Sequence, residues 1–135
     1  MNQEPAVLQV LTDYYAAFST LDAQACSPYF HEPSLLIGPQ GIFAATTHAV
    51  LTTAFTSAIE SLRARGFGRS EFSVRDVQSL SATATLVTGV AIRYKLDGKE
   101  LERVGVTYVL HKADAGWKIA VLLLHDVNER DLTTR

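Results

Sequence analysis

An Asp-Gly dipeptide at positions 97–98 separates two long runs that are rich in β-branched residues. A type I′ hairpin turn needs positive φ at both central positions, and Asp-Gly adopts this conformation readily. The runs 83–94 and 99–112 are therefore expected to pair as antiparallel strands. The tetrapeptide at 113–116 is a second expected turn, and 117–126 is a third expected strand. The last third of the chain thus predicts a three-stranded meander.

Counting outward from the first turn sets the expected register, with Tyr94 opposite Leu101 and Arg93 opposite Glu102. Because side chains alternate across a strand, this register sorts the residues onto two faces unless a hairpin contains a bulge. The more apolar face is expected to pack against helices, with Arg93, Glu102 and His125 towards one end. Its other members are Val87, Gly89, Ala91, Val104, Val106, Tyr108, Leu110, Trp117, Ile119, Val121 and Leu123.

The opposite face of the meander mixes apolar and polar side chains. It is too apolar to face water and too polar for a deep core, which indicates a protein interface. This outer face is expected to include Tyr94, Arg103, Thr107, Leu122 and Leu124.

The composition describes one ordered globular domain. The chain has 135 residues, of which 47% are hydrophobic and 19% are charged. We expect a single domain over 1–135, with a core at about 5–126 and tails at 1–4 and 128–135. The formal net charge of −2, with no basic run, argues against nucleic acid as a partner.

Neither a membrane location nor a bound metal is expected. No apolar run is long enough to span a bilayer, and no signal peptide is evident, so we expect a cytoplasmic protein. Cys26 is the only cysteine, and the four histidines have no metal-ligand spacing. No phosphate-binding loop appears, so no cofactor is expected.

Hydrophobic periodicity and turn residues predict the elements before the meander. Asp22 is the expected N-cap of a short helix, and Thr46 or Thr47 the expected cap of a long one. Gly66 is the expected helix stop. In order, the expected elements are a helix at 5–19, a short helix at 23–29, short strands at 34–37 and 42–44 around a turn at 38–41, a helix at 48–65 and a strand at 67–78.

This α-α-β-β-α-β-β-β-β order resembles the nuclear-transport-factor-2-like superfamily, also called the SnoaL-like or cystatin-like α+β cone. The segments that carry the resemblance are the aromatic run at 14–18, the Leu-Asp-Ala at 21–23 and the Gly-Trp-Lys-Ile at 116–119. It implies a strongly curved, mostly antiparallel sheet wrapped around a long helix and two N-terminal helices. It also implies an enclosed pocket and a homodimer through the outer sheet face.

Members of this superfamily include isomerases, dehydratases and non-catalytic binding modules, so the fold leaves the function open. In ketosteroid isomerase-like members a first-helix tyrosine donates to the ligand, and Tyr14 occupies a comparable place. His125, at neutral pH, suits a general acid or base. The carboxylates that an isomerase needs have no counterpart, because Val104, Val106 and Val121 are aliphatic.

The dehydratase and epoxide hydrolase patterns are also incomplete. His125, His31 and Tyr14 supply only part of a histidine–aspartate–tyrosine set, and Arg93 alone does not make an Asp-Arg-Asp set. If Arg93 and Glu102 line the pocket, they are suited to binding a carboxylate or polarising a carbonyl. The favoured interpretation is an ion pair near the hairpin tip. The expected catalytic residues are His125 and Tyr14, and the expected pocket residues are Tyr14, Phe18, His31, Phe55, Arg93, Val104, Tyr108, Trp117, Val121 and His125.

Two hypotheses follow, and the sequence leaves open whether the protein is an enzyme. In the first, an apolar cone pocket binds or transforms a small hydrophobic molecule by isomerase or lyase chemistry. In the second, the chain is a non-catalytic dimeric assembly or partner-binding module. For His125 the favoured interpretation is structural, as a core or rim histidine bonded to a neighbour.

Overall fold

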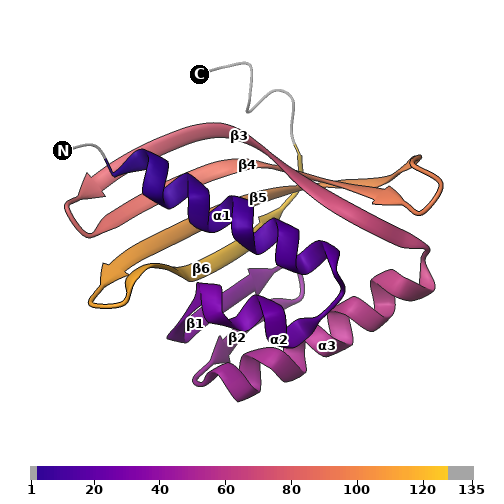
Figure 1. Cartoon of the computed structure of the whole chain (residues 1–135), viewed down its shortest axis with the longest axis horizontal. Coiled ribbons are helices and arrows are strands. Elements are labelled where there is room, and N and C mark those ends of the chain that lie inside the picture. The colour runs from indigo at the N-terminus through magenta and orange to yellow at the C-terminus, as the bar shows by residue number, and fades with distance from the viewer. Residues whose placement is uncertain (1–2, 128–135) are drawn as a thin grey trace.

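The computed structural model describes residues 3–127 and shows the expected α+β architecture. Helices pack against one side of a strongly curved six-stranded sheet (Figure 1). The expected tail at 128–135 lies outside the described residues, whereas Glu4, expected in the other tail, is helical. The elements are α1 (Glu4–Ser19), α2 (Ala23–Cys26), the 3-10 turn η1 (Ser27–Tyr29), β1 (Phe30–Gly38), β2 (Gly41–Ala45), α3 (His48–Ala64), β3 (Phe67–Ser81), β4 (Ala84–Lys95), β5 (Glu100–Ala113) and β6 (Gly116–His125).

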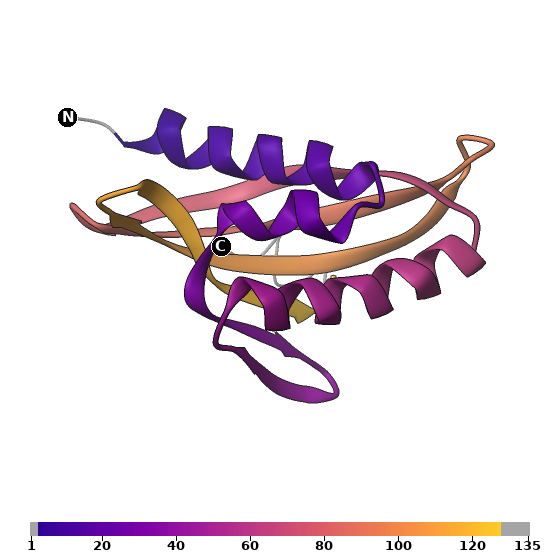
Figure 2. The same ribbon diagram turned by 60° about the horizontal axis from the view of Figure 1, so that its bottom comes forward.

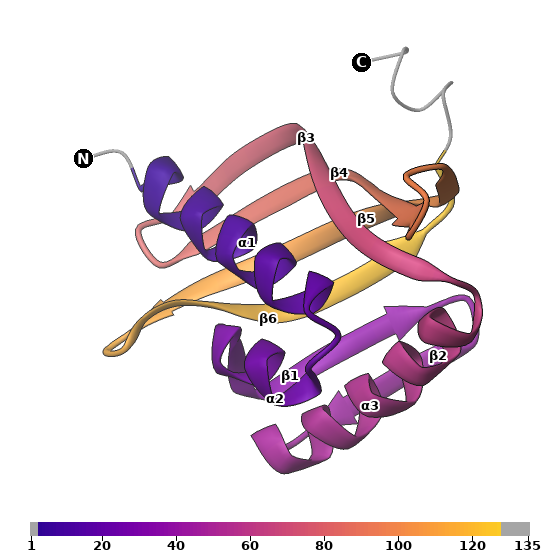
Figure 3. The same ribbon diagram turned by 45° about the vertical axis from the view of Figure 1, so that its right-hand side comes forward.

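The sheet has the strand order β2-β1-β6-β5-β4-β3. All neighbouring strands are antiparallel except β1 and β6, which are parallel. Figure 3 shows α1 lying across the long strands and α3 lying over the β1–β2 hairpin, in agreement with their contacts. In Figure 2 the same hairpin extends below α3, so the helices and the hairpin enclose one end of the sheet.

Helices α2 and α3 begin where their capping residues predict, but α2 ends at Cys26 rather than at residue 29 and is followed by the 3-10 turn η1. The Asp22 carboxylate accepts a hydrogen bond from the Gln24 amide at 3.0 Å, which caps α2. Of the two candidate threonines, Thr47 caps α3 by accepting from the Val50 amide at 3.2 Å. Gly66 follows α3 with φ of 85°, a conformation that glycine adopts without strain. No helix among residues 3–127 is long and apolar enough to cross a membrane.

Strand β1 is longer than the predicted 34–37 because it is paired on both edges. It pairs with β2 through the expected hairpin and with β6 through a parallel ladder that local sequence does not signal. The added residues include Phe30, which pairs with Ile119 of β6, and Gly38, which pairs with Gly41 of β2. The long-range pairing therefore places the β1–β2 hairpin beside the end of β6.

The first long hairpin has the predicted register over most of its length. Arg93 pairs with Glu102, and Ala91 pairs with Val104. The register shifts only next to the turn, where Tyr94 pairs with Glu100 rather than with Leu101. Arg93 and Glu102 therefore lie side by side on the inner face, as predicted.

The second long hairpin contains a β-bulge that the sequence did not reveal. Leu110 pairs with Ile119 as expected, but the next pair is Val109 with Val121, which leaves Ala120 as the extra residue. A one-residue insertion reverses the side of every residue beyond it. The expected faces of the end of β6 are therefore wrong: Leu122 and Leu124 point inward, and Val121, Leu123 and His125 point outward.

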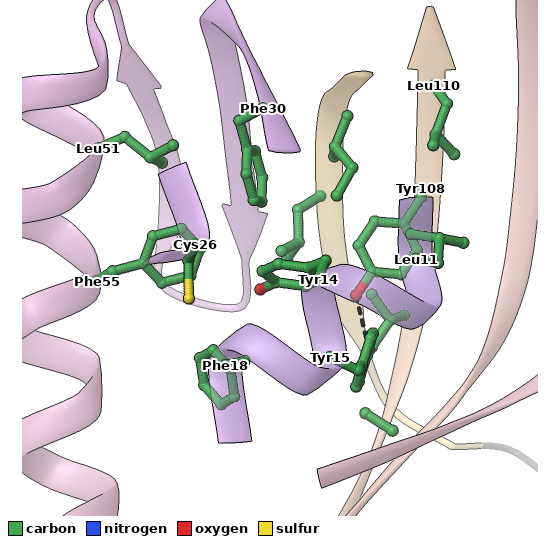
Figure 4. Close-up of a cluster of buried hydrophobic side chains, with 14 of the residues drawn as sticks. Leu11, Tyr14, Tyr15, Phe18, Cys26, Phe30, Leu51, Phe55, Tyr108 and Leu110 are labelled. Carbon is green, nitrogen blue, oxygen red and sulfur yellow. Dashed lines mark hydrogen bonds between the residues drawn. The ribbon is translucent and has the colours of Figure 1, made fainter. Parts of the chain in front are cut away.

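The core is an aromatic cluster centred on Tyr14 (Figure 4). Its ring lies 5.3 to 6.3 Å, centroid to centroid, from five neighbouring rings. Tyr15, the next residue on α1, is also buried. The curved sheet explains this, because it wraps α1 so that Tyr14 packs towards α3 while Tyr15 stacks on the sheet. The neighbouring rings of Tyr14 are Tyr15, Phe18, Phe30, Phe55 and Tyr108.

Candidate ligand pocket

A cavity of about 590 Å³ lies between α3, the β1–β2 hairpin and the inner face of the sheet. Pockets of 300–1,000 Å³ with apolar walls and a few polar groups are typical of sites for small molecules. Exposed residues of α3 and the hairpin, including Ile42, Ala58 and Arg65, mark the mouth. The lining consists of Tyr14, Tyr15, Phe18, Leu36, Ile37, Gly38, Pro39, Gln40, Gly41, Ile42, Phe43, Ala54, Phe55, Ala58, Ser61, Leu62, Arg65, Ser70, Ala91, Arg93, Val106, Tyr108, Leu122 and Leu124.

Three tyrosines supply hydroxyl groups to the cavity wall. The hydroxyl oxygens of Tyr15 and Tyr108 lie 2.6 Å apart and form a hydrogen bond. Within residues 3–127 the Tyr14 hydroxyl has no hydrogen-bond partner. Figure 4 shows it pointing away from the Tyr15–Tyr108 pair, on the side of Phe55. Tyr14 therefore presents the one unpaired hydroxyl of this cluster.

Burial keeps these tyrosines protonated. Loss of solvation raises the pKa of Tyr14, Tyr15 and Tyr108 above the ordinary tyrosine value. The positive charge of Arg93 acts in the opposite direction on all three pKa values but does not outweigh burial. The three hydroxyls are therefore hydrogen-bond donors at neutral pH rather than bases.

A cluster of three charged residues borders the cavity. Arg93 donates through Nη1 to Glu102, and Arg65 donates through Nη2 to the other Glu102 oxygen at 2.7 Å. Burial acts to raise the pKa of Glu102, but these hydrogen bonds lower it, so the pKa lies below the ordinary value. Both arginines line the cavity. The glutamate is thus an anion held between two cations.

Ser70 adds a hydroxyl beside this cluster. It is buried on β3, directly across the strand pair from Arg93, and it lines the cavity. Its backbone N–H donates to the Ser19 hydroxyl at 3.0 Å, which ties β3 to the end of α1. No residue within 3–127 bonds the Ser70 hydroxyl itself.

The structure brings together only some of the residues expected in the pocket. Tyr14 and Phe18 from α1 meet Phe55 from α3 in the lining. Arg93 and Tyr108, from β4 and β5, complete this group. The other expected positions, His31, Val104, Trp117, Val121 and His125, lie outside the lining.

His125 lies on the outer face, so its expected inward position beside Val104 is wrong. It pairs with Gly105, and its Nε2 lies 3.0 Å from the Thr107 hydroxyl. Its ring covers Gly105, where a Cβ would come within 2.4 Å of Nδ1. The bulge at Ala120 is the cause, because it reverses the end of β6. A catalytic role for His125 in the cavity loses its geometric basis.

The remaining expected residues have other surroundings. His31 Nε2 lies 3.0 Å from His111 Nδ1 at the surface. Trp117 packs beneath the start of α1 and donates from Nε1 to the Gln3 side chain at 3.1 Å. Val121 points outward beyond the bulge, and Val104 keeps its inner position opposite Ala91 without reaching the cavity.

Several lining residues were not foreseen from the sequence. Leu122 and Leu124 were assigned to the outer face because the bulge was not recognised. Arg65 was expected only as the last residue of a helix. A charged residue that directly follows the apolar stripe of a helix is also typical of the rim of a cavity, and this signal could have identified it. The hairpin residues 38–43 reach the cavity through the parallel β1–β6 pairing, for which no local signal exists.

Comparison with solved structures places the fold among cystatin-like and NTF2-like proteins. A domain of unknown function with a cystatin-like fold from Nostoc punctiforme matches with a TM-score of 0.77 and 20% identity over 96% of this chain and 81% of that one. An NTF-2 like protein of unknown function from Shewanella oneidensis matches at 0.75 and 18% over 93% and 100%. A ketosteroid isomerase-like protein from Erwinia carotovora atroseptica matches at 0.69 and 18% over 95% and 99%. These identities show the fold alone.

No curated protein matches the sequence. A family described as NTF2-like protein (DUF6841) matches residues 3–127, which confirms the resemblance inferred from the order of elements. The chain belongs to this NTF2-like family.

Proposed function

We propose that this protein binds a small, largely apolar molecule in its pocket, with the Tyr14 hydroxyl donating a hydrogen bond to an oxygen of that molecule. The observation that carries the proposal is the unpaired Tyr14 hydroxyl in the wall of the cavity. This hydroxyl is open to the cavity rather than sealed in the core, so a ligand oxygen can accept its hydrogen bond in place of water. Phe18, Phe55 and Leu122 offer apolar surface on either side.

The lining favours binding over turnover. Isomerase and lyase chemistry removes a proton from the substrate and needs a base that is active near neutral pH. Among residues 3–127, the lining contains hydroxyl, amide and guanidinium groups but no carboxylate or imidazole. Burial raises the pKa of the three tyrosines, which keeps them as donors. The similarity to a ketosteroid isomerase-like protein supports ring-bearing compounds as one class to test.

A fluorescent neutral probe, N-phenylnaphthylamine, tests whether the cavity binds apolar molecules. Ala58 lies at the mouth and lines the cavity, whereas the adjacent Ser57 is exposed outside the lining. We expect Ala58→Trp to block the mouth and weaken probe binding by about tenfold or more, and Ser57→Trp to leave it unchanged. Equal binding by both variants would contradict a site in this cavity.

A competition experiment with acetonaphthone, a neutral ketone of similar size to the probe, tests the role of Tyr14. The affinity of the ketone is measured from its displacement of the bound probe. Tyr14→Phe removes one hydroxyl and keeps the ring. We expect the ketone to bind about tenfold more weakly to this variant, because one donor to a buried carbonyl is lost. Affinity for the probe itself, which has no oxygen, should remain the same.

Assembly through the outer sheet face is a second proposal, and it is compatible with the first. Apolar side chains on this face remain partly exposed, with Leu35 at 38% and Val109 and Leu123 half-buried. Such a surface suits a homodimer contact. Thr107 and Arg103 keep their expected outer positions, whereas Val121 and Leu123 replace Leu122 and Leu124.

We also propose that the protein is cytoplasmic, since Cys26 is a free, buried thiol.

A further inference from the structure

The charged end of the pocket carries more positive than negative charge. Arg93 and Arg65 both contact Glu102, and a single carboxylate cannot neutralise two guanidinium groups. The Arg93 side chain is only 18% exposed, so water screens its charge poorly. One positive charge therefore remains uncompensated beside an apolar cavity.

The hydrogen bonding of Arg93 is also incomplete. Its Nη1 donates to Glu102, but its Nε is shielded from solvent and has no partner among the described residues. A buried guanidinium is usually bonded along more than one edge, because each unpaired N–H costs free energy. Arg93 and Ser70, whose hydroxyl is also unbonded, both line the cavity.

The field of Arg93 reaches into the pocket. Burial is the main influence on the tyrosines and raises their pKa values, and Arg93 is the charged residue that acts to lower the pKa values of Tyr14, Tyr15 and Tyr108. The positive charge of Arg93 therefore acts on the cavity wall, although the chain as a whole has a net charge of −2.

We propose that the natural ligand is an amphipathic carboxylate whose charged head group lies between Arg93, Arg65 and Ser70 and whose apolar body fills the rest of the cavity. This inference rests on the proposed function, because it names the class of molecule that the same pocket takes. A carboxylate accepts several hydrogen bonds from guanidinium groups at once. It also supplies a negative charge where two guanidinium groups share the single carboxylate of Glu102.

Displacement of N-phenylnaphthylamine by decanoate and by its uncharged analogue decanamide tests the inference. The two competitors share an apolar chain and differ in charge. We expect decanoate to bind the wild-type protein at least about tenfold more tightly than decanamide. Arg93→Gln should abolish this preference, so that the two competitors bind about equally, because Arg65 and Glu102 then neutralise each other. Decanamide affinity should change little.

Two further variants separate the charge of the site from a structural role of Arg93. Glu102→Gln leaves both arginines unopposed, so the preference for decanoate should increase at least about threefold. Arg69 is a matched control, because it pairs with Glu71 outside the pocket lining. Arg69→Gln should preserve the wild-type preference.

The outcomes distinguish this inference from the proposed function. Equal displacement by decanoate and decanamide, with probe binding still sensitive to Ala58→Trp, would overturn the carboxylate inference and leave the apolar pocket standing. A preference that Arg93→Gln leaves intact would overturn it as well. Probe binding that is insensitive to Ala58→Trp would overturn the proposed function, and this inference with it.

Discussion

The hydroxyl oxygens of Tyr15 and Tyr108 lie 2.6 Å apart, although the residues are 93 positions apart in the sequence. Their hydrogen bond joins α1 to β5 across the closed end of the cavity. One of the two hydroxyls donates and the other accepts, so the Tyr14 hydroxyl is the one in this cluster that takes part in no hydrogen bond among residues 3–127. This bond should stabilise the fold, while the Tyr14 hydroxyl is the group that we propose for ligand binding.

Removing either member of this pair should destabilise the protein. Tyr15→Phe and Tyr108→Phe each leave a buried hydroxyl without its partner, at a cost of about 1–3 kcal/mol in the free energy of unfolding. The double variant should cost less than the sum of the two single variants. Urea denaturation measures all three. Tyr14→Phe is the control and should change stability by less than about 0.5 kcal/mol, since its hydroxyl has no partner. Additive costs would show that the two hydroxyls do not interact.

The contact between Gly105 and His125 gives a test of the β5–β6 register. A Cβ at Gly105 would lie 2.4 Å from Nδ1 of the histidine, so Gly105→Ala should destabilise the protein by about 1–3 kcal/mol. Adding His125→Ala removes the ring and should restore part of that loss; the rest should remain, because the Cβ would still lie 2.8 Å from the Asp126 carbonyl oxygen. Thermal or urea unfolding of the single and double variants measures the effect. An inward His125 would give no such rescue.

Local sequence was sufficient for the elements that are held by local interactions. Asp22, Thr47 and Gly66 set helix ends through bonds to residues close in sequence, and the Asp-Gly turn fixed Arg93 opposite Glu102. The bulge at Ala120 and the parallel pairing of β1 with β6 depend on the packing of distant strands. For that reason His125 was assigned to the wrong face, and the hairpin wall of the cavity was not foreseen.

Stability should depend on pH through Glu102. Burial acts to raise the pKa of this carboxyl, but the hydrogen bonds from Arg65 and Arg93 bring the folded-state pKa below the ordinary value of about 4.3. The folded state therefore gains stability above pH of about 4.3, and the gain is lost as the pH falls through the lower folded-state pKa. Glu102→Gln lacks this gain. Its stability deficit, measured by urea unfolding, should be full at neutral pH and shrink in acid.

If the difference in unfolding free energy between Glu102→Gln and the parent were the same at all pH values, the role given to the ionised Glu102 carboxylate would be contradicted. That result would show that the substitution disturbs packing rather than an ionised carboxylate. Glu71→Gln is a suitable control, because Glu71 pairs with Arg69 at an exposed site. This substitution should change the stability of the protein little at any pH.

The outer sheet face should determine the oligomeric state. Leu123 points outward from β6 in the centre of the proposed contact. A carboxylate there would be desolvated without a partner, so Leu123→Asp should weaken dimerisation by about a hundredfold or more. Leu96→Asp is the control, because Leu96 is 84% exposed at a hairpin tip away from this face. Light scattering after size exclusion measures the mass. A monomeric parent, or a Leu123→Asp dimer, would contradict the proposed interface.

The most direct test of a ligand bound to Tyr14 is an NMR titration with acetonaphthone. The protein is labelled with carbon-13 at tyrosine Cζ, and the Cζ resonance of Tyr14 is followed. The Cζ atom carries the hydroxyl, so its shift reports hydrogen bonding of that group, and Tyr14→Phe assigns the signal. Tyr29, which lies outside the lining, is the internal reference. We predict that the Tyr14 signal moves and saturates with the affinity measured by probe displacement, while the Tyr29 signal stays fixed. Saturable binding that leaves the Tyr14 signal in place would contradict the account.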